Sequence, residues 1–205
     1  MRIAVPVVGL LALALGACGQ AQDAPQAPPS GEATQAASPS APAKAATPSA
    51  AAVVALDADG LRFVTADTGR TSLLAFGAKR AMVEAAVARA TGGKPQRSVS
   101  EECPAGPTQF TRFGELQLAF QEGLWIGWAL GGASPVTTMD GIGIGSTRAE
   151  VERTRNLTMI PESTLDEEFV LGSAEQETAI GGVFATPGPE GRVAYLWAGV
   201  ACNFR

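Results

Sequence analysis

The residue types that carry most enzyme chemistry are missing from this sequence or stand at the wrong spacing. The chain has no histidine, so it lacks the commonest general base, the commonest metal ligand and the usual partner of a serine or cysteine nucleophile. It has no nucleophile-elbow, phosphate-loop or zinc-protease motif. We therefore expect no catalytic residues, no metal and no cofactor, and we predict that the protein is not an enzyme.

Carboxylates are the remaining groups that could act as acids, bases or metal ligands. An acidic stretch comprises Glu162, Asp166-Glu167-Glu168, Glu175 and Glu177. It lacks the alternating oxygen ligands and the central glycine of a calcium-binding loop, so we interpret it as a solvated face. A carboxylate-only enzyme that depends on Glu102 or Asp166 is the lowest-ranked hypothesis for this chain.

A glycine-rich run, Gly141-Ile142-Gly143-Ile144-Gly145, precedes a predicted helix, as the fingerprint of a dinucleotide-binding loop does. Ser146 stands where the third glycine of Gly-x-Gly-x-x-Gly belongs, and no alternating series of strands and helices surrounds the run. We interpret these glycines as a tight entry to a helix beside a sheet. No motif supports a dehydrogenase.

An apolar run from Ile3 to Leu15 follows Met1-Arg2 and ends just before Cys18. It is too short to cross a bilayer, which takes about 20 apolar residues, and its length is typical of a signal peptide. Leu15-Gly16-Ala17-Cys18 resembles the lipobox of bacterial lipoproteins. This resemblance implies that residues 1–17 are removed and that Cys18 carries lipid, including an acyl group such as palmitate. The alternative is a generic signal peptide with a chance cysteine.

The residue after the lipidated cysteine affects sorting in Gram-negative lipoproteins. Gly19 occupies the position where Asp would signal retention in the inner membrane, so the resemblance implies an outer-membrane anchor with the chain facing the periplasm. Residues 18–52 are mostly Ala, Pro, Ser, Gln, Thr and Gly, which cannot bury enough apolar surface to fold. We predict that they form a disordered tether, and that residues 53–205 form the globular domain.

Charge argues against nucleic acid as a partner. The chain has 15 Lys and Arg against 20 Asp and Glu, a net charge of −5, and no basic cluster. Loss of Arg2 with the signal peptide makes the mature chain slightly more negative. Strong binding to nucleic acid or to anionic lipid needs a basic surface, so we expect membrane attachment through the lipid anchor only.

Cysteine parity suggests a disulfide. The chain has three cysteines, and lipid on Cys18 leaves Cys103 and Cys202 in a compartment that is normally oxidising. We predict a disulfide between these two. The alternative is a pair of buried thiols, because cysteine also serves as a small hydrophobic residue.

An internal repeat at a shift of 68 residues indicates how the globular part is organised. Residues 74–84 align with 142–152, with identical residues at 77/145, 80/148, 81/149, 83/151 and 84/152. The shift also matches Gly114 with Gly182, and Glu122-Gly123 with Glu190-Gly191. We predict two tandem repeats, at about 53–136 and 137–205.

Each repeat has the pattern of a helix followed by an antiparallel β-meander. In the first, helical spacing from Met82 to Ala90 ends at Gly92-Gly93. In the second, Thr147 and Glu150 have the spacing of a capping box. The strands are expected at 108–113, 116–120 and 124–130, and at 168–171, 178–185 and 192–198. A leading hairpin around Asp59-Gly60 is expected to add an edge. The predicted class is α+β, with one continuous sheet and helices on one face.

This order of elements resembles two families, the BamE/SmpA-like outer-membrane lipoproteins and the beta-lactamase-inhibitor-protein-like tandem repeats. The resemblance is carried by residues 74–84 and 142–152. It implies a domain that binds proteins and performs no chemistry. We therefore expect a lipid-anchored, periplasm-facing module that binds or scaffolds a protein partner. The alternative is an inhibitor-like module that binds a secreted enzyme.

Two aromatic residues are the candidate partner contacts. Alternation along residues 124–130 places Trp128 and Leu130 on one face and Trp125 on the other. If helices cover the first face, Trp125 and Phe110 lie on the open face, where a partner can dock against them. The alternative is that both belong to a satellite core under the leading hairpin.

Overall fold

The computed structural model describes residues 52–172 and 178–202. The chain divides into two units, Met1–Ala45 and Ala46–Arg205, and the described residues all belong to the second. Cys18, the predicted signal peptide and residues 18–51 of the predicted tether therefore lie outside the described residues. The described ranges fold into two helices and two mainly antiparallel sheets, which confirms the predicted α+β class. Neither helix is long and apolar enough to cross a membrane.

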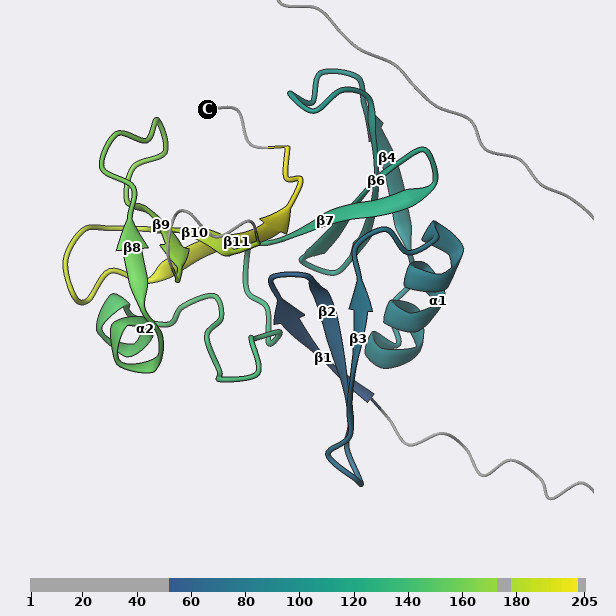
Figure 1. Ribbon diagram of the computed structural model, residues 1–205, viewed down its shortest axis with the longest axis horizontal. Coiled ribbons are helices and arrows are strands. Elements are labelled where there is room, and N and C mark those ends of the chain that lie inside the picture. The colour runs from purple at the N-terminus through teal and green to yellow at the C-terminus, as the bar shows by residue number, and fades with distance from the viewer. Residues whose placement is uncertain (1–51, 173–177, 203–205) are drawn as a thin grey trace, which may run out of the picture. The chain divides into compact units, whose positions relative to one another are not determined.

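The larger sheet has eight strands in the order β4-β5-β6-β7-β11-β10-β9-β8 (Figure 1). They are β4 (Gln96–Ser100), β5 (Thr108–Phe113), β6 (Leu116–Gln121), β7 (Leu124–Leu130), β8 (Leu157–Met159), β9 (Glu168–Leu171), β10 (Ile180–Phe184) and β11 (Val193–Gly199). Strands close to β5, β6, β7, β9, β10 and β11 were predicted from alternation. The edge strands β4 and β8 were not, because β4 is almost entirely polar and β8 has only three residues.

The smaller sheet consists of β1 (Ala52–Asp57), β2 (Gly60–Thr65) and β3 (Thr71–Ala75). The hairpin between β1 and β2 was predicted, but its expected place at an edge of the larger sheet is wrong. The physical reason is that Leu56 and Leu61 are buried in the common core, with exposed fractions of 2% and 0%. The hairpin thus packs its apolar face against the larger sheet instead of extending it.

Helix α1 ends, and helix α2 begins, where the sequence predicts. α1 (Arg80–Thr91) stops at Gly92, which has the left-handed φ of 67° that glycine adopts without strain. α2 (Arg148–Thr154) starts with the predicted capping box. The Thr147 hydroxyl accepts from the Glu150 N–H at 3.2 Å, and the Glu150 carboxylate accepts from the Thr147 N–H at 2.8 Å.

The core lies on one face of the larger sheet. A row of neighbouring residues crosses β5, β6, β7, β11, β10 and β9 on this face. It consists of Thr111, Leu118, Trp128, Ala198, Ile180 and Leu171, all of them buried. Val83 and Val87 of α1 and Val151 of α2 belong to the same apolar cluster. In the view of Figure 1, both helices and the smaller sheet lie below the larger sheet.

A β-bulge corrects the expected placement of Trp125. The register between β6 and β7 shifts at Phe120, so that Ala119 pairs with Gly127 but Phe120 pairs with Trp125. The extra residue reverses the alternation, and Trp125 lies in the same core as Trp128. Trp125 is fully buried and packs edge-on against Phe76, with ring centroids 4.8 Å apart. Its predicted position on the open face is wrong.

Candidate protein-binding face

The face of the larger sheet that points away from the core is called the open face here. One row of paired residues crosses all eight strands on it: Gln96, Arg112, Gln117, Ala129, Trp197, Gly181, Val170 and Thr158. Alternation fixes the side, because Thr111, next to Arg112, donates to Glu84 on α1. Likewise Leu116 and Leu118, on either side of Gln117, are in the core.

Two aromatic residues of β11 occupy the middle of this face. Tyr195 and Trp197 lie two residues apart, with ring centroids 5.8 Å apart. Glycines make room for both rings. A Cβ on Gly181 would come within 2.5 Å of the Trp197 ring, and one on Gly131 within 3.1 Å of the Tyr195 ring. Trp197 is 6% exposed and Tyr195 is half-buried, so the tyrosine is the more accessible of the two.

Arg112 and Gln117 supply polar groups beside these rings. The exposed Arg112 donates to the Gln117 side-chain oxygen at 3.0 Å, and no ion pair with a described carboxylate holds it. Burial raises the pKa of Tyr195, while the nearby Arg112 charge opposes that shift. Tyrosine, tryptophan and arginine are the residue types that dominate binding energy at protein interfaces.

The two predicted contact residues have different positions. Trp125 belongs to the core and presents no surface. Phe110 of β5 alternates with Thr111 and therefore lies on the open face, as expected, but it is only 7% exposed. Its neighbours in the sheet are Ser98 and Ala119. Phe110 therefore contributes to the floor of the face rather than to its accessible part.

The structure brings Cys103 and Cys202 together. Both are free thiols here, joined by a side-chain hydrogen bond to each other. Cys103 lies in the loop between β4 and β5 and is buried, and Cys202 follows β11 and is half-buried. Their proximity is compatible with the predicted disulfide, which stays a prediction. Cys18, the predicted lipid site, lies outside the described residues.

A buried ionic cluster lies under α1 on the core side. The Glu84 carboxylate, 9% exposed, accepts from Arg80 (2.8 Å), Arg97 (3.0 and 2.6 Å) and Thr111 (2.6 Å). These hydrogen bonds, led by those of Arg97, lower the pKa of Glu84 to about 2 despite its burial. Because every oxygen has a partner, the cluster fastens α1 to β4 and β5 and offers no group to a substrate.

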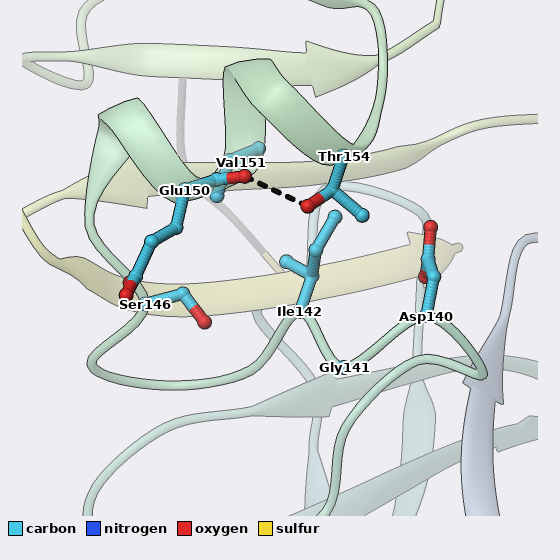
Figure 2. Close-up of a pocket in the computed structure, with 7 residues that line it drawn as sticks. All are labelled: Asp140, Gly141, Ile142, Ser146, Glu150, Val151 and Thr154. Carbon is cyan, nitrogen blue, oxygen red and sulfur yellow. Dashed lines mark hydrogen bonds between the residues drawn. The ribbon is translucent and has the colours of Figure 1, made fainter.

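A hollow of about 200 Å³ lies between α2 and the loop that carries the glycine-rich run (Figure 2). Its polar side chains are already engaged. Asp140 accepts from Arg155 at 2.6 Å, Ser146 accepts from the Gly143 N–H at 3.1 Å, and Thr154 donates to the Glu150 carbonyl at 2.8 Å. The polar groups of the hollow therefore hold the two ends of α2 and the loop before it, and none of them is directed at a ligand. This agrees with our interpretation of the glycines as a tight entry to the helix.

The acidic stretch does not assemble into a metal site within the described residues, where no group of His, Cys, Asp or Glu has metal-binding geometry. Glu168 is buried and accepts from Ser163, and Glu167 lies 3.9 Å from Arg148. Glu175 and Glu177 lie outside the described residues.

Compared with models of protein families, with curated proteins and with solved structures, the chain has no significant match in any of the three. The geometry of the open face is therefore the main support for a function.

Sequence reasoning missed Tyr195, Trp197 and Arg112. A signal for the first two was present, because they alternate with Leu196 along a predicted strand. No such signal marks Arg112, because its position beside Tyr195 results from strands that are far apart in the sequence.

Proposed function

We propose that this protein is a lipid-anchored, periplasm-facing envelope protein that binds a protein partner on its open face and performs no chemistry. The main observation in support is the row across eight strands, which includes Arg112 and Trp197, together with Tyr195 beside Trp197 on the same face. A broad sheet face with aromatic residues and an arginine that no described carboxylate pairs suits a protein surface better than a small molecule.

The anchor rests on Leu15-Gly16-Ala17-Cys18 and on the low-complexity residues that follow. Labelling of growing cells with an alkyne analogue of palmitate tests it. We expect label on the wild-type chain in the outer-membrane fraction and none on Cys18→Ser. Equal labelling of the two chains would contradict lipid attachment at Cys18.

We also propose that the domain is a tandem duplication. Helix α1 is followed by strands β4 to β7, and α2 by strands β8 to β11. Hydrogen bonds recur at the shift of 68 residues: Gly77 N–H to Trp125 O (2.7 Å) and Gly145 N–H to Val193 O (2.8 Å), and Arg80 N–H to Gly123 O (2.9 Å) and Arg148 N–H to Gly191 O (2.8 Å). These contacts support the alignment of residues 74–84 with 142–152.

A bulge recurs as well, since the register shifts at Phe120 between β6 and β7 and at Phe184 between β10 and β11. One predicted match is wrong: Gly114 lies in the turn between β5 and β6, but Gly182 lies within β10. The loop between β10 and β11 is longer than the turn between β6 and β7, so a single shift does not align all strands.

Partner binding is tested with a photo-crosslinking amino acid placed at Gln117 on the open face. Met82, 59% exposed on α1, is the matched control on the core side of the sheet. We expect a defined crosslinked species in intact cells from position 117, absent from position 82, and lost when Tyr195→Ala is added. The same species from both positions would contradict binding on the open face.

The identity of the crosslinked protein separates the two binding hypotheses. An envelope-assembly component supports a scaffold, and a secreted enzyme that is inhibited by the purified domain supports an inhibitor. Turnover of any substrate by the domain, abolished by replacing Glu102 or Asp166, would overturn the non-catalytic proposal.

A further inference from the structure

The chain segment that leaves β11 runs toward the far end of β4 and β5. Gly199 pairs with Gly127 of β7, and the Val200 N–H donates to the Ile126 carbonyl at 2.8 Å. Two residues later, the Cys202 thiol makes hydrogen bonds with Cys103 and Ser100. β4 is four strands away from β11 in the sheet order. The segment Val200–Cys202, called the strap here, therefore links the centre of the sheet to its edge.

The strap lies on the side of the open face. Ser100 pairs with Thr108 and has the same alternation as Ser98 and Phe110, which belong to that face. In Figure 1 the yellow segment after β11 rises from the sheet on the side opposite to the helices. Cys202 is also near enough to Tyr195 to raise the pKa of its hydroxyl. The strap thus approaches both the floor of the face and its accessible tyrosine.

The strap fits closely against the backbone of β7. A Cβ on Gly127 would come within 2.2 Å of the Val200 carbonyl oxygen, and one on Gly199 within 2.4 Å of the Ile126 carbonyl oxygen. Only glycine allows this approach at both positions. The strap therefore has a defined seat at its start, and at its end it is held by the contacts of Cys202.

The two thiols differ in acidity. Burial raises the pKa of both, but hydrogen bonds from Cys202, Thr108 and the Ala105 backbone leave the pKa of Cys103 below its ordinary value. The pKa of Cys202 is raised to about 11, by burial first and then by Cys103. Cys103 is thus the more acidic of the two thiols and the one that ionises first, with Cys202 as a hydrogen-bond partner, an arrangement that favours thiol–disulfide exchange.

We propose that Cys103 and Cys202 form a redox-controlled latch, in which a disulfide fixes the strap against the loop between β4 and β5. In the reduced chain hydrogen bonds, rather than a covalent bond, hold the end of the strap, so that it opens away from the open face far more readily. This inference rests on the proposed function in one respect, because the face that the latch covers is the proposed partner-binding face.

The chemistry of closing needs an oxidant that itself carries a disulfide. Both S–H bonds of the protein break and one S–S bond forms between Cys103 and Cys202. The two electrons and two protons pass to the oxidant, whose own S–S bond breaks to give two thiols. Opening is the reverse reaction, in which two thiol groups of a reductant, on one molecule or on two, supply the electrons and protons and form a disulfide.

The latch is tested first without any partner. The full chain is incubated with oxidised or reduced glutathione, alkylated and digested. After oxidation we expect a linked peptide that contains Cys103 and Cys202, and after reduction alkylation of both. Because the cysteines are identified by peptide mapping, any reaction of Cys18 is distinguished from that of Cys103 and Cys202. Absence of the linked peptide after oxidation would overturn the proposal.

Movement of the strap is measured by hydrogen exchange on the same samples. We expect the Val200 and Cys202 amides to exchange at least tenfold faster in the reduced chain, with α1 unchanged. The Cys202→Ser chain should exchange at the fast rate in both conditions. Because Cys202 is only half-buried, this variant is expected to fold, which an unchanged far-ultraviolet spectrum would verify. Equal exchange in the two redox states would show a static crosslink and refute the latch.

The link to partner binding is a separate measurement. The crosslink yield from position 117 should be higher in reduced than in oxidised cells, and it should not depend on redox state in Cys202→Ser. If exchange changes but the yield does not, the latch stands and its control of binding is refuted. If no crosslink forms in either state although the linked peptide and the exchange difference are found, the proposed function fails and the latch does not.

Discussion

Glu84 of α1 and Arg97 of β4 are joined by two hydrogen bonds, 3.0 and 2.6 Å long, from the guanidinium to the two carboxylate oxygens. Arg80 and Thr111 complete the shell around the same carboxylate. The only long-range ion pair of α1 among the described residues thus ties the helix to the edge strand of the larger sheet. Two predictions follow from this pair.

Glu84→Gln is expected to lower the free energy of unfolding by about 2–4 kcal/mol, because it leaves two arginines beside a neutral group in a largely buried site. The matched control is Glu152→Gln on α2. There the equivalent pair with Arg148, 2.7 Å long, has a carboxylate side chain that is 45% exposed, and its loss should cost less than about 1 kcal/mol. Urea unfolding of both variants measures the difference. Equal costs would contradict a special role for Glu84.

Acid sensitivity should follow from the same carboxylate. The pKa of Glu84 is about 2 in the folded chain, against an ordinary value of 4.5. A lowered folded-state pKa means that the stabilisation is fully present above about pH 4.5 and is lost as the pH falls toward 2. The stabilisation from this carboxylate is at most about 3.4 kcal/mol. Unfolding free energies measured from pH 6 to pH 2 should therefore fall less steeply in Glu84→Gln than in the wild type.

The two helix starts differ in capping and allow a paired test. Thr147 caps α2 through its side chain, but Lys79, at the equivalent position before α1, makes no such hydrogen bond. Thr147→Ala should therefore destabilise the domain by about 1 kcal/mol, and Lys79→Ser should stabilise it by about 0.5–1 kcal/mol. Thermal unfolding followed by circular dichroism measures both. A loss of stability in Lys79→Ser would show that its side chain has another role.

Trp125 and Tyr195 should separate stability from binding. Trp125→Ala removes a fully buried ring from the core and should cost about 3–5 kcal/mol. Tyr195→Ala on the open face should cost much less and should abolish the crosslink from position 117. Melting temperature and crosslink yield are the two measurements. A Tyr195→Ala chain that keeps its partner would exclude the tyrosine as an anchor residue.

Gly181 should be intolerant of a side chain only while Trp197 is present. Because a Cβ at this position meets the indole ring at 2.5 Å, Gly181→Ala is expected to cost about 1–3 kcal/mol. In a Trp197→Ala background the same change should cost less than about 0.5 kcal/mol, so a double-mutant cycle gives the coupling between them. A cost that persists in that background would point to backbone strain instead of the ring.

The sequence by itself determined the local elements of this protein. The capping box at Thr147, the stop at Gly92, the β1–β2 hairpin and six strands of the larger sheet all follow from hydrogen-bonding residues and periodicity within short segments. The missing histidine likewise limits the available chemistry before any fold is known. These features depend on neighbours in the chain, and so a single sequence contains the information.

Only the tertiary structure decided which side chains lie on which face. One bulged residue in β7 places Trp125 in the core, although simple alternation predicts that it lies on the open face. No local pattern in the sequence marks that extra residue. The hairpin packs face-on against the larger sheet because this position buries Leu56 and Leu61 in the common core. Pairing at the edge of the larger sheet would not bury these two side chains in the same way. The sheet brings the charge of Arg112 near Tyr195 and the thiol of Cys103 within hydrogen-bonding reach of Cys202. The residues of each pair are about 80 to 100 positions apart in the sequence. Such encounters depend on packing across the whole domain, which sequence periodicity does not encode.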